Sequence, residues 1–259
     1  SRFEVVGDQA LPETEKVLLV GDDQGKMGGQ VPAGHQGGAL HFGPDGKLYI
    51  AIGEQTAGTP SQHLDTFLGK MLRIDRDGNV PLDNPLRDQT EGKYQAIWAY
   101  GMRNPFTFAI RPSDGLMLIN DVGGTQEEIN VGQPGGNYGW PIIPHGVGNQ
   151  AQFIDPIHWY PEASISGGDF LGDAAGWPSE YAGRYFFADF KHGWIHSIDP
   201  QDGQQASEFA SGLRRPVDLR FDSNGRLLVL LRNAWVIDGK FEDGPSSLLA
   251  IPPPPAVPQ

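Results

Sequence analysis

The sequence predicts an all-β protein with a β-propeller fold, and three observations carry this prediction. Glycine and proline are frequent, with 36 and 22 residues in a chain of 259, and they separate many short apolar segments. An all-β protein with many turns has this composition. One pattern, in which a turn joins two short apolar strands, recurs along the chain. Few segments show the periodicity of an amphipathic helix.

The first copy of this hairpin pattern follows two short strands that we expect at residues 2–6 and 16–20. Its own strands are expected at 39–42 and 47–53. A Gly-Pro-Asp-Gly sequence lies between them and is typical of a tight turn between antiparallel strands. The first copy is therefore predicted to be a β-hairpin.

Two further copies repeat the pattern. The second has strands at 108–111 and 116–120, joined by a Ser-Asp-Gly turn. The third has strands at 219–221 and 226–231, joined by an Asp-Ser-Asn-Gly turn. Asn-Gly and Asp-Gly are favoured in hairpin turns because both tolerate left-handed backbone conformations.

A fourth, more divergent copy is expected in the wide gap between the second and third, with strands at 183–189 and 193–199. Outer strands are expected at 69–75 and 96–100. Residues 141–182 are rich in glycine, proline and aromatic residues, and we interpret them as long loops on one face together with outer strands.

Repeats of about 50 residues are typical of propellers and arrays. We therefore expect about five blades of roughly four strands each in this chain. Residues 1–250 would form a single propeller domain, and residues 251–259 would form a proline-rich, extended or disordered tail.

Composition excludes several classes of function. The net charge is −13 and the chain has no lysine or arginine cluster, whereas nucleic-acid-binding proteins usually carry a basic patch. An acidic chain suits divalent cations. Cysteine is absent, so disulfides and thiolate metal sites are impossible. No apolar run approaches the roughly 20 residues of a membrane-spanning helix, and we expect no membrane insertion.

The most informative stretch is 98–140. Its apolar run is broken by Arg103-Asn104-Pro105, a strand ends in Asp121, and a Gly-Gly loop with paired glutamates follows. A core strand would not contain these charges, because buried charge is costly unless it is paired or binds a ligand. We interpret the stretch as one blade whose inner end carries a cofactor site.

Several segments resemble the soluble quinoprotein glucose and aldose sugar dehydrogenases. The matches include HQGGALHFGPDGKLYIAIGE at 35–54, LGKMLRIDRDG at 68–78, IWAYGMRNPFTF at 97–108, DVGGTQEEIN at 121–130 and GGNYGWP at 135–141. Weaker matches follow at 188–198 and 213–225. Each segment alone is weak evidence, but together they occur in the order of the family and span most of the chain.

The resemblance implies a six-bladed propeller, of which this chain would lack the first blade. It implies that pyrroloquinoline quinone (PQQ) and Ca²⁺ bind on one face, and that an aldose sugar is oxidised at C1 to the lactone. It also implies a soluble electron acceptor and a periplasmic or extracellular location. It gives no expectation for sugar preference or oligomeric state.

The resemblance assigns His35 as the general base that takes the C1 hydroxyl proton. It assigns Arg103, Asn104, Lys191 and Arg215 to the cofactor. These assignments are chemically reasonable, because PQQ carries several carboxylates and arginine forms fork-shaped hydrogen bonds to such groups. A histidine with a pKa of about 6.5 suits a general base near neutral pH.

For the metal, the resemblance assigns the backbone carbonyls of Gly123 and Gly124 to the calcium beside the cofactor. Calcium accepts carbonyl oxygens, and glycine leaves them unobstructed. Glu128 and Tyr138 match ligands of a second calcium. There are also departures from the family: Gly34 replaces an acid that often precedes the base, and Val217 replaces a second arginine of the cofactor site.

Two other functions are consistent with parts of the pattern. A calcium-dependent propeller lactonase would need side-chain carboxylates and amides around a central metal. A non-catalytic propeller that binds carbohydrate or protein would need none of these groups. The retention of His35, Arg103 and Lys191 favours the dehydrogenase.

Overall fold

The computed structural model describes residues 1–22, 34–143, 151–161, 163–172, 176–203, 205–237, 240–242 and 244–254. In this described part the secondary structure consists of β-strands and short 3-10 helices, with no α-helix. Among the same residues, no helix is long and apolar enough to cross a membrane. The predicted all-β class is therefore confirmed.

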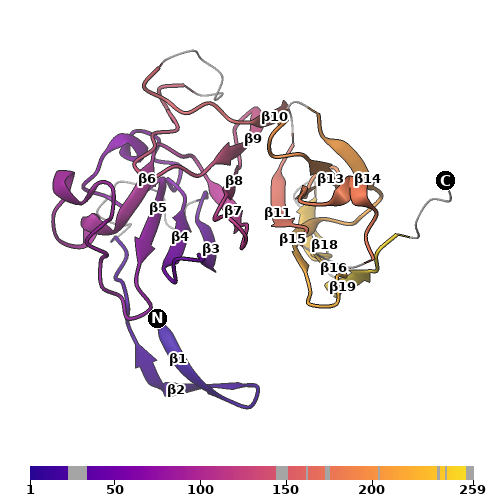
Figure 1. Ribbon diagram of the computed structural model, residues 1–259, viewed down its shortest axis with the longest axis horizontal. Coiled ribbons are helices and arrows are strands. Elements are labelled where there is room, and N and C mark those ends of the chain that lie inside the picture. The colour runs from indigo at the N-terminus through magenta and orange to yellow at the C-terminus, as the bar shows by residue number, and fades with distance from the viewer. Residues whose placement is uncertain are drawn as a thin grey trace.

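Four antiparallel sheets follow one another along the described chain (Figure 1). The first contains β3 (Gly37–Phe42), β4 (Leu48–Ile52), β5 (Lys70–Ile74) and β6 (Ile97–Tyr100). The second contains β7 (Pro105–Ile110), β8 (Met117–Asp121), β9 (Gln126–Val131) and β10 (His158–Pro161). In both sheets the spatial order of the strands follows their order in the sequence, as in the blades of a propeller.

The third sheet contains β11 (Ile165–Phe170), β12 (Tyr185–Asp189), β13 (Trp194–Ile198) and β14 (Ser207–Ala210). The fourth contains β15 (Pro216–Phe221), β16 (Leu227–Leu231) and β19 (Ser247–Ile251). We expected about five blades, and the described residues form four blade-like sheets.

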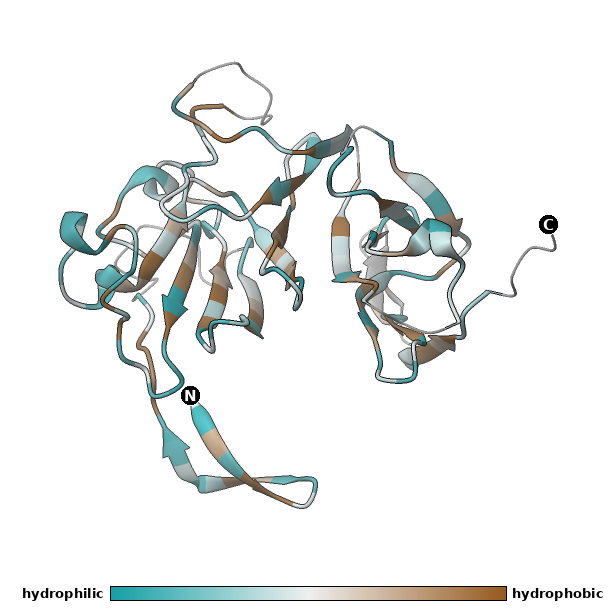
Figure 2. Ribbon diagram, in the orientation of Figure 1, coloured by the Kyte–Doolittle hydropathy of each residue, from teal (hydrophilic) through white to brown (hydrophobic). Residues whose placement is uncertain are grey.

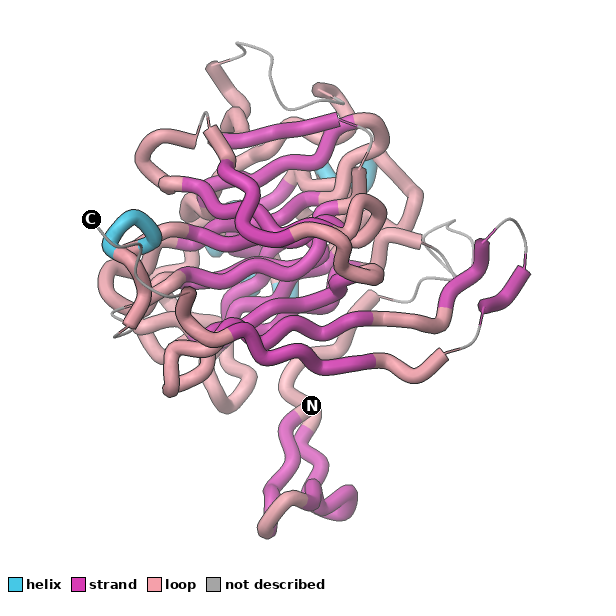
Figure 3. Tube along the Cα trace, turned by 90° about the vertical axis from the view of Figure 1, so that its right-hand side faces the viewer, coloured by secondary structure: helices cyan, strands magenta, loops and turns pink. Residues whose placement is uncertain are grey.

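Two hairpins stand apart from these sheets. One pairs β1 (Arg2–Val6) with β2 (Gln9–Lys16) and projects from the body of the molecule (Figure 3). The other pairs β17 (Trp235–Ile237) with β18 (Lys240–Glu242). The strand expected at 16–20 was wrong, because β2 ends at Lys16 and the next apolar residues, Leu18 and Leu19, pack against the first sheet instead of joining a ladder.

The first strands of the four sheets, β3, β7, β11 and β15, lie side by side. Hydrogen bonds link their starts. The Thr107 hydroxyl donates to the Ser166 carbonyl, and the Ser166 hydroxyl donates to the Pro216 carbonyl. The four inner strands therefore begin on the same face, which is the arrangement of a propeller.

The prediction for the fourth repeat was out of phase by one strand. The strands expected at 183–189 and 193–199 are β12 and β13, the second and third of their sheet. The stretch 141–182 does hold an outer strand, β10, as expected, but the inner strand β11 also lies there and was not expected. Gly167 and Gly168 explain the error. A Cβ at Gly167 would overlap the backbone of Asp218 and Leu219, and one at Gly168 would overlap the Tyr185 hydroxyl, so close packing replaces the usual apolar alternation.

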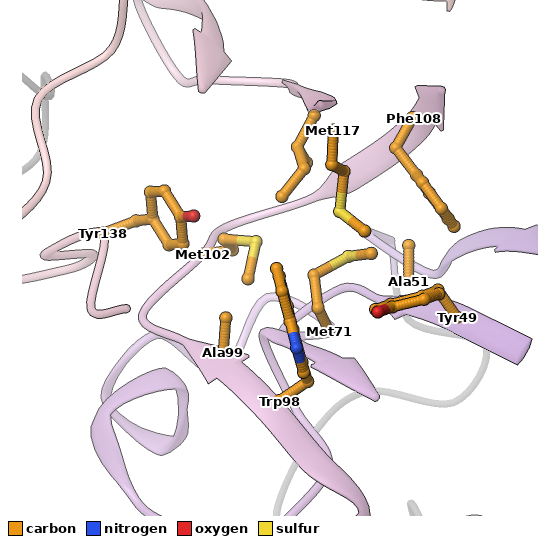
Figure 4. Close-up of a cluster of buried hydrophobic side chains, with 10 residues drawn as sticks. Tyr49, Ala51, Met71, Trp98, Ala99, Met102, Phe108, Met117 and Tyr138 are labelled. Carbon is orange, nitrogen blue, oxygen red and sulfur yellow. The ribbon is translucent and has the colours of Figure 1, made fainter. Parts of the chain in front are cut away.

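Apolar side chains fill each junction between neighbouring sheets, and apolar residues concentrate in the strands (Figure 2). Between the first two sheets, Met71 and Met102 lie beside the Trp98 indole, and Phe108 belongs to the same cluster (Figure 4). Burying a side chain of this size contributes about 1.5–3 kcal/mol. These junctions hold the inner strands in register and so fix the face on which they begin.

Candidate active site

The predicted site residues occupy equivalent places in successive sheets. His35, Arg103-Asn104 and Arg215 each precede the inner strand of a sheet, namely β3, β7 and β15. The Gly123-Gly124 loop follows the second strand β8, and Lys191 follows the second strand β12. Since the inner strands begin on one face, and each second strand runs antiparallel to its inner strand, all these loops belong to that face.

His35 is held by a buried acid that the sequence reasoning missed. The imidazole Nδ1 hydrogen-bonds to Glu54 Oε1, and the other Glu54 oxygen accepts the backbone N–H of Gly58. Glu54 is only 1% exposed, whereas the His35 side chain is 22% exposed. Burial acts to raise the pKa of Glu54, but the hydrogen bonds from His35 and Gly58 outweigh it, and the pKa lies below its usual value. An ionised Glu54 fixes the Nδ1 proton and leaves Nε2 as the nitrogen that can accept one.

The backbone around His35 is also tightly specified. His35 has a left-handed backbone conformation with φ of 55°, and its carbonyl accepts the N–H of Gln55. A Cβ at Gly53 would overlap this carbonyl, so glycine is required at the crossing. Strained backbone is typical of functional sites, where the surrounding structure imposes it.

Hydrogen bonds connect Arg103 and Asn104 to two neighbours of His35, Glu54 and Gly37. The Asn104 side-chain oxygen accepts the N–H of Gly37 at 3.0 Å, and the Arg103 carbonyl accepts the N–H of Glu54 at 2.9 Å. Asp121, at the end of β8, accepts the backbone N–H groups of both Arg103 and Asn104. Burial raises the pKa of Asp121 to about 6, although these two N–H groups act to lower it. His35, Arg103 and Asn104 therefore belong to one hydrogen-bond network.

The Arg103 guanidinium contacts the loop that was assigned to calcium. Its Nη1 donates to the carbonyls of Val122 and Gly123 at 2.7 and 2.9 Å, and its Cζ lies 5.3 Å from the centre of the Trp140 ring. A Cβ at Gly123 would overlap the Gln126 carbonyl, whereas Gly124 has open space around it. The loop fits calcium in that its carbonyls carry no obstructing side chain, and each keeps a second lone pair.

Lys191 shares a cavity with the same loop. A cavity of about 470 Å³ is lined by Gly124, Thr125, Gln126, Pro161, Ala163 and Lys191. Its volume is within the range of small-molecule sites. The backbone N–H of Lys191 donates to Asp189, which anchors the lysine at the end of β12. The structure thus brings together two predicted residues from neighbouring sheets.

Arg215 lies at the equivalent place in the fourth sheet. Its backbone has φ of 51°, and its Nη1 donates to the Asn233 carbonyl at 2.6 Å. It is not among the residues that line the Lys191 cavity. Its role toward a cofactor therefore stays a prediction.

Glu128 and Tyr138 also come together, in a small cavity that Arg103, Asp121 and Trp140 help to line. Burial, followed by the nearby Asp121 charge, raises the pKa of Glu128 to about 8. The Tyr138 hydroxyl donates to the Val131 carbonyl and accepts the Gln133 N–H, so it is already used by the protein. Within the described residues, no group of three or more His, Cys, Asp or Glu residues is placed to hold a metal. A second calcium here stays a prediction.

A polar site at the face where the inner strands of four successive antiparallel sheets begin defines a propeller protein with a ligand-binding face. Comparison with known families makes this more specific. The family model for glucose / sorbosone dehydrogenase matches residues 5–236, and the chain belongs to this family.

Curated relatives support this membership. The chain is 40% identical over 114 residues to the aldose sugar dehydrogenase of Escherichia coli K12, a match that covers 44% of this chain and 30% of that protein. It is 36% identical over 128 residues to quinoprotein glucose dehydrogenase B of Acinetobacter calcoaceticus, covering 42% and 26% of the two chains. Each match thus spans less than a third of the relative.

Solved structures show the same fold. A protein from Thermus thermophilus, described as a glucose dehydrogenase, superposes with a TM-score of 0.76 at 26% identity, covering 89% of this chain and 67% of that one. The PQQ-bound aldose sugar dehydrogenase of Streptomyces coelicolor superposes with a TM-score of 0.69 at 26% identity, covering 83% and 61%. The predicted propeller class is confirmed.

Proposed function

We propose that this protein is a PQQ- and Ca²⁺-dependent dehydrogenase that oxidises the C1 hydroxyl of an aldose sugar to the lactone. The observation that carries the proposal is the His35–Glu54 pair, joined by hydrogen bonds to the Arg103-Asn104 loop. A base, its orienting acid and a cationic side chain thus lie in one network. Family membership supports the same chemistry.

In this proposal His35 takes the proton of the C1 hydroxyl at Nε2. Glu54 holds the imidazole through Nδ1 and stabilises the imidazolium that forms, because its buried carboxylate is ionised. Bound PQQ would accept the hydride from C1, and Ca²⁺ would polarise its quinone carbonyl. The protein's contribution is to orient the sugar hydroxyl, the base and the acceptor relative to one another.

The cationic side chains have a separate role. Arg103, Lys191 and Arg215 would face the carboxylates of PQQ and supply local positive charge in a chain with a net charge of −13. The Gly123 and Gly124 carbonyls would ligate Ca²⁺ beside the cofactor. We also propose a soluble electron acceptor and a location in the periplasm or outside the cell, because the family resemblance implies both.

The experiment is reconstitution of the purified protein with PQQ and Ca²⁺, followed by dye reduction with several aldoses. Sugar-dependent dye reduction that requires both additions is the expected result. Absence of dye reduction and of any change in quinone absorbance would contradict the proposal. Hydrolysis of a sugar lactone without added PQQ would instead identify a lactonase, and carbohydrate binding without turnover would identify a binding protein.

A further inference from the structure

We propose that Asp121 is a positioning residue that sets the backbone from which His35, Arg103 and Asn104 act. This inference rests on the proposed function, because it names the residue that holds the base and the cofactor side chains in one arrangement. Asp121 contacts none of the reacting atoms in this proposal. It acts through the two residues that it holds.

Both oxygens of the Asp121 carboxylate accept backbone N–H groups. Asp121 is the last residue of β8 and is 4% exposed. Its Oδ1 accepts the Asn104 N–H at 2.6 Å, and its Oδ2 accepts the Arg103 N–H at 3.0 Å. Burying a carboxylate is costly, and hydrogen bonds from two adjacent backbone N–H groups offset that cost. Both oxygens therefore fix the backbone at the entrance to β7.

Two hydrogen bonds connect the start of β7 to the surroundings of His35. The Asn104 side chain accepts the N–H of Gly37, two residues beyond His35, at 3.0 Å. The Arg103 carbonyl accepts the N–H of Glu54, whose carboxylate holds the His35 imidazole. A shift of the Arg103-Asn104 backbone would move both supports of the base together.

An aspartate fixes the start of the inner strand in the third sheet as well. Asp189 occupies the same place in the third sheet, since Asp121 pairs with Pro105 and Asp189 pairs with Ile165, each at the start of an inner strand. Asp189 accepts the N–H of Ser164 at 2.7 Å. An acid at this register position therefore fixes the entrance to the inner strand in two successive sheets.

The test is Asp121→Asn, which keeps the size of the side chain. An amide offers one acceptor oxygen and turns its own N–H₂ toward the second backbone donor. The control is Asp222→Asn, the same substitution away from the site. Asp222 accepts two backbone N–H groups, from Asn224 and Arg226, both at Oδ1, in a turn at the opposite end of its sheet.

The first readout is amide hydrogen exchange, which needs neither PQQ nor activity. We expect exchange at Arg103, Asn104 and Gly37 to become about tenfold faster or more in Asp121→Asn, because the bonds that protect these amides are weakened. Asp222→Asn should leave them unchanged. Unchanged exchange at all three amides in Asp121→Asn would overturn the inference.

The second readout is kinetic, on protein reconstituted with PQQ and Ca²⁺. We expect Asp121→Asn to lower kcat by about tenfold or more while KM for the sugar changes less than about threefold, since misplacing the base affects the chemical step more than sugar binding. A wild-type kcat in a variant with faster exchange would also overturn the inference. If the wild-type protein turns over no sugar, the proposed function fails, and the exchange experiment still decides whether Asp121 sets this backbone.

If Asp121→Asn does not fold, Asn104→Ala carries the test. This variant removes the side-chain link to Gly37 and leaves the backbone bonds of Asp121 in place. Exchange should then rise at Gly37 while the Arg103 amide stays slow. Unchanged exchange at Gly37 would overturn the connection between Asp121 and the base.

Discussion

Glu54 determines the state of the proposed base more than any residue that the sequence patterns singled out. Its carboxylate is buried, yet its pKa stays below the usual value because His35 and Gly58 both donate to it. His35 was predicted from the family resemblance. Glu54 was not, although it ends the family-matching segment 35–54, because its contact with His35 arises only when β3 and β4 pair.

At the residue scale we predict that Glu54→Gln lowers kcat by about a hundredfold, since the neutral amide no longer stabilises an imidazolium. The size of the side chain is kept, so thermal unfolding should change much less than activity. Steady-state kinetics with a saturating aldose measures the effect. Equal kcat values for Glu54→Gln and wild-type protein would exclude this role for Glu54.

The elements show which part of the fold can be predicted from sequence. Three inner hairpins were predicted because a short turn with Asp-Gly or Asn-Gly joins their strands. The pairing of β11 with β12 was missed, since β11 ends at Phe170 and β12 begins only at Tyr185, so no short turn with that signature joins them. His35, Arg103, Gly123, Lys191 and Arg215 share one face because each lies in a loop that precedes an inner strand or follows a second strand. The sequence placed Asp121 at a strand end, but its bonds to the Arg103 and Asn104 N–H groups and the contact of Trp140 with Arg103 are tertiary contacts that no local pattern reports.

At the element scale we predict that Gly168→Ala destabilises the protein by about 1–3 kcal/mol, the usual cost of overpacking. The added methyl group would overlap the Tyr185 hydroxyl, which itself bonds to Asn120 in the buried centre of the second sheet. The matched control is Gly172→Ala, because Gly172 has nothing within 4 Å of a Cβ. Urea unfolding measures both variants. Equal stabilities would show that β11 does not pack as described.

On the scale of the whole molecule, a side-chain contact joins the first sheet to the fourth. Arg220 of β15 places Nη2 2.5 Å from Nε2 of His41 on β3. His41 also packs edge-on against Phe108, and the Asp169 and Asp218 carboxylates lie 3.9 Å from the Arg220 guanidinium. Burial, followed by the Arg220 charge, lowers the pKa of His41 to about 4.

At this scale we predict a stability change with pH. Between pH 6.5 and about 4 the unfolded chain binds a proton at His41 that the folded protein does not, so the free energy of unfolding falls as pH is lowered through this window. A His41→Gln variant should lack this contribution. Denaturant unfolding of both proteins at several pH values measures it, and parallel curves would show that His41 does not titrate this way.

The central claim is that loops from separate sheets build one site in which His35 serves a bound quinone. The most direct measurement is the absorbance of PQQ bound in the presence of Ca²⁺, recorded after an aldose is added without any dye. The account predicts sugar-dependent loss of the oxidised-quinone spectrum in the wild-type protein and none in His35→Ala, with PQQ bound by both. An unchanged spectrum in the wild-type protein, or equal reduction in His35→Ala, would contradict it.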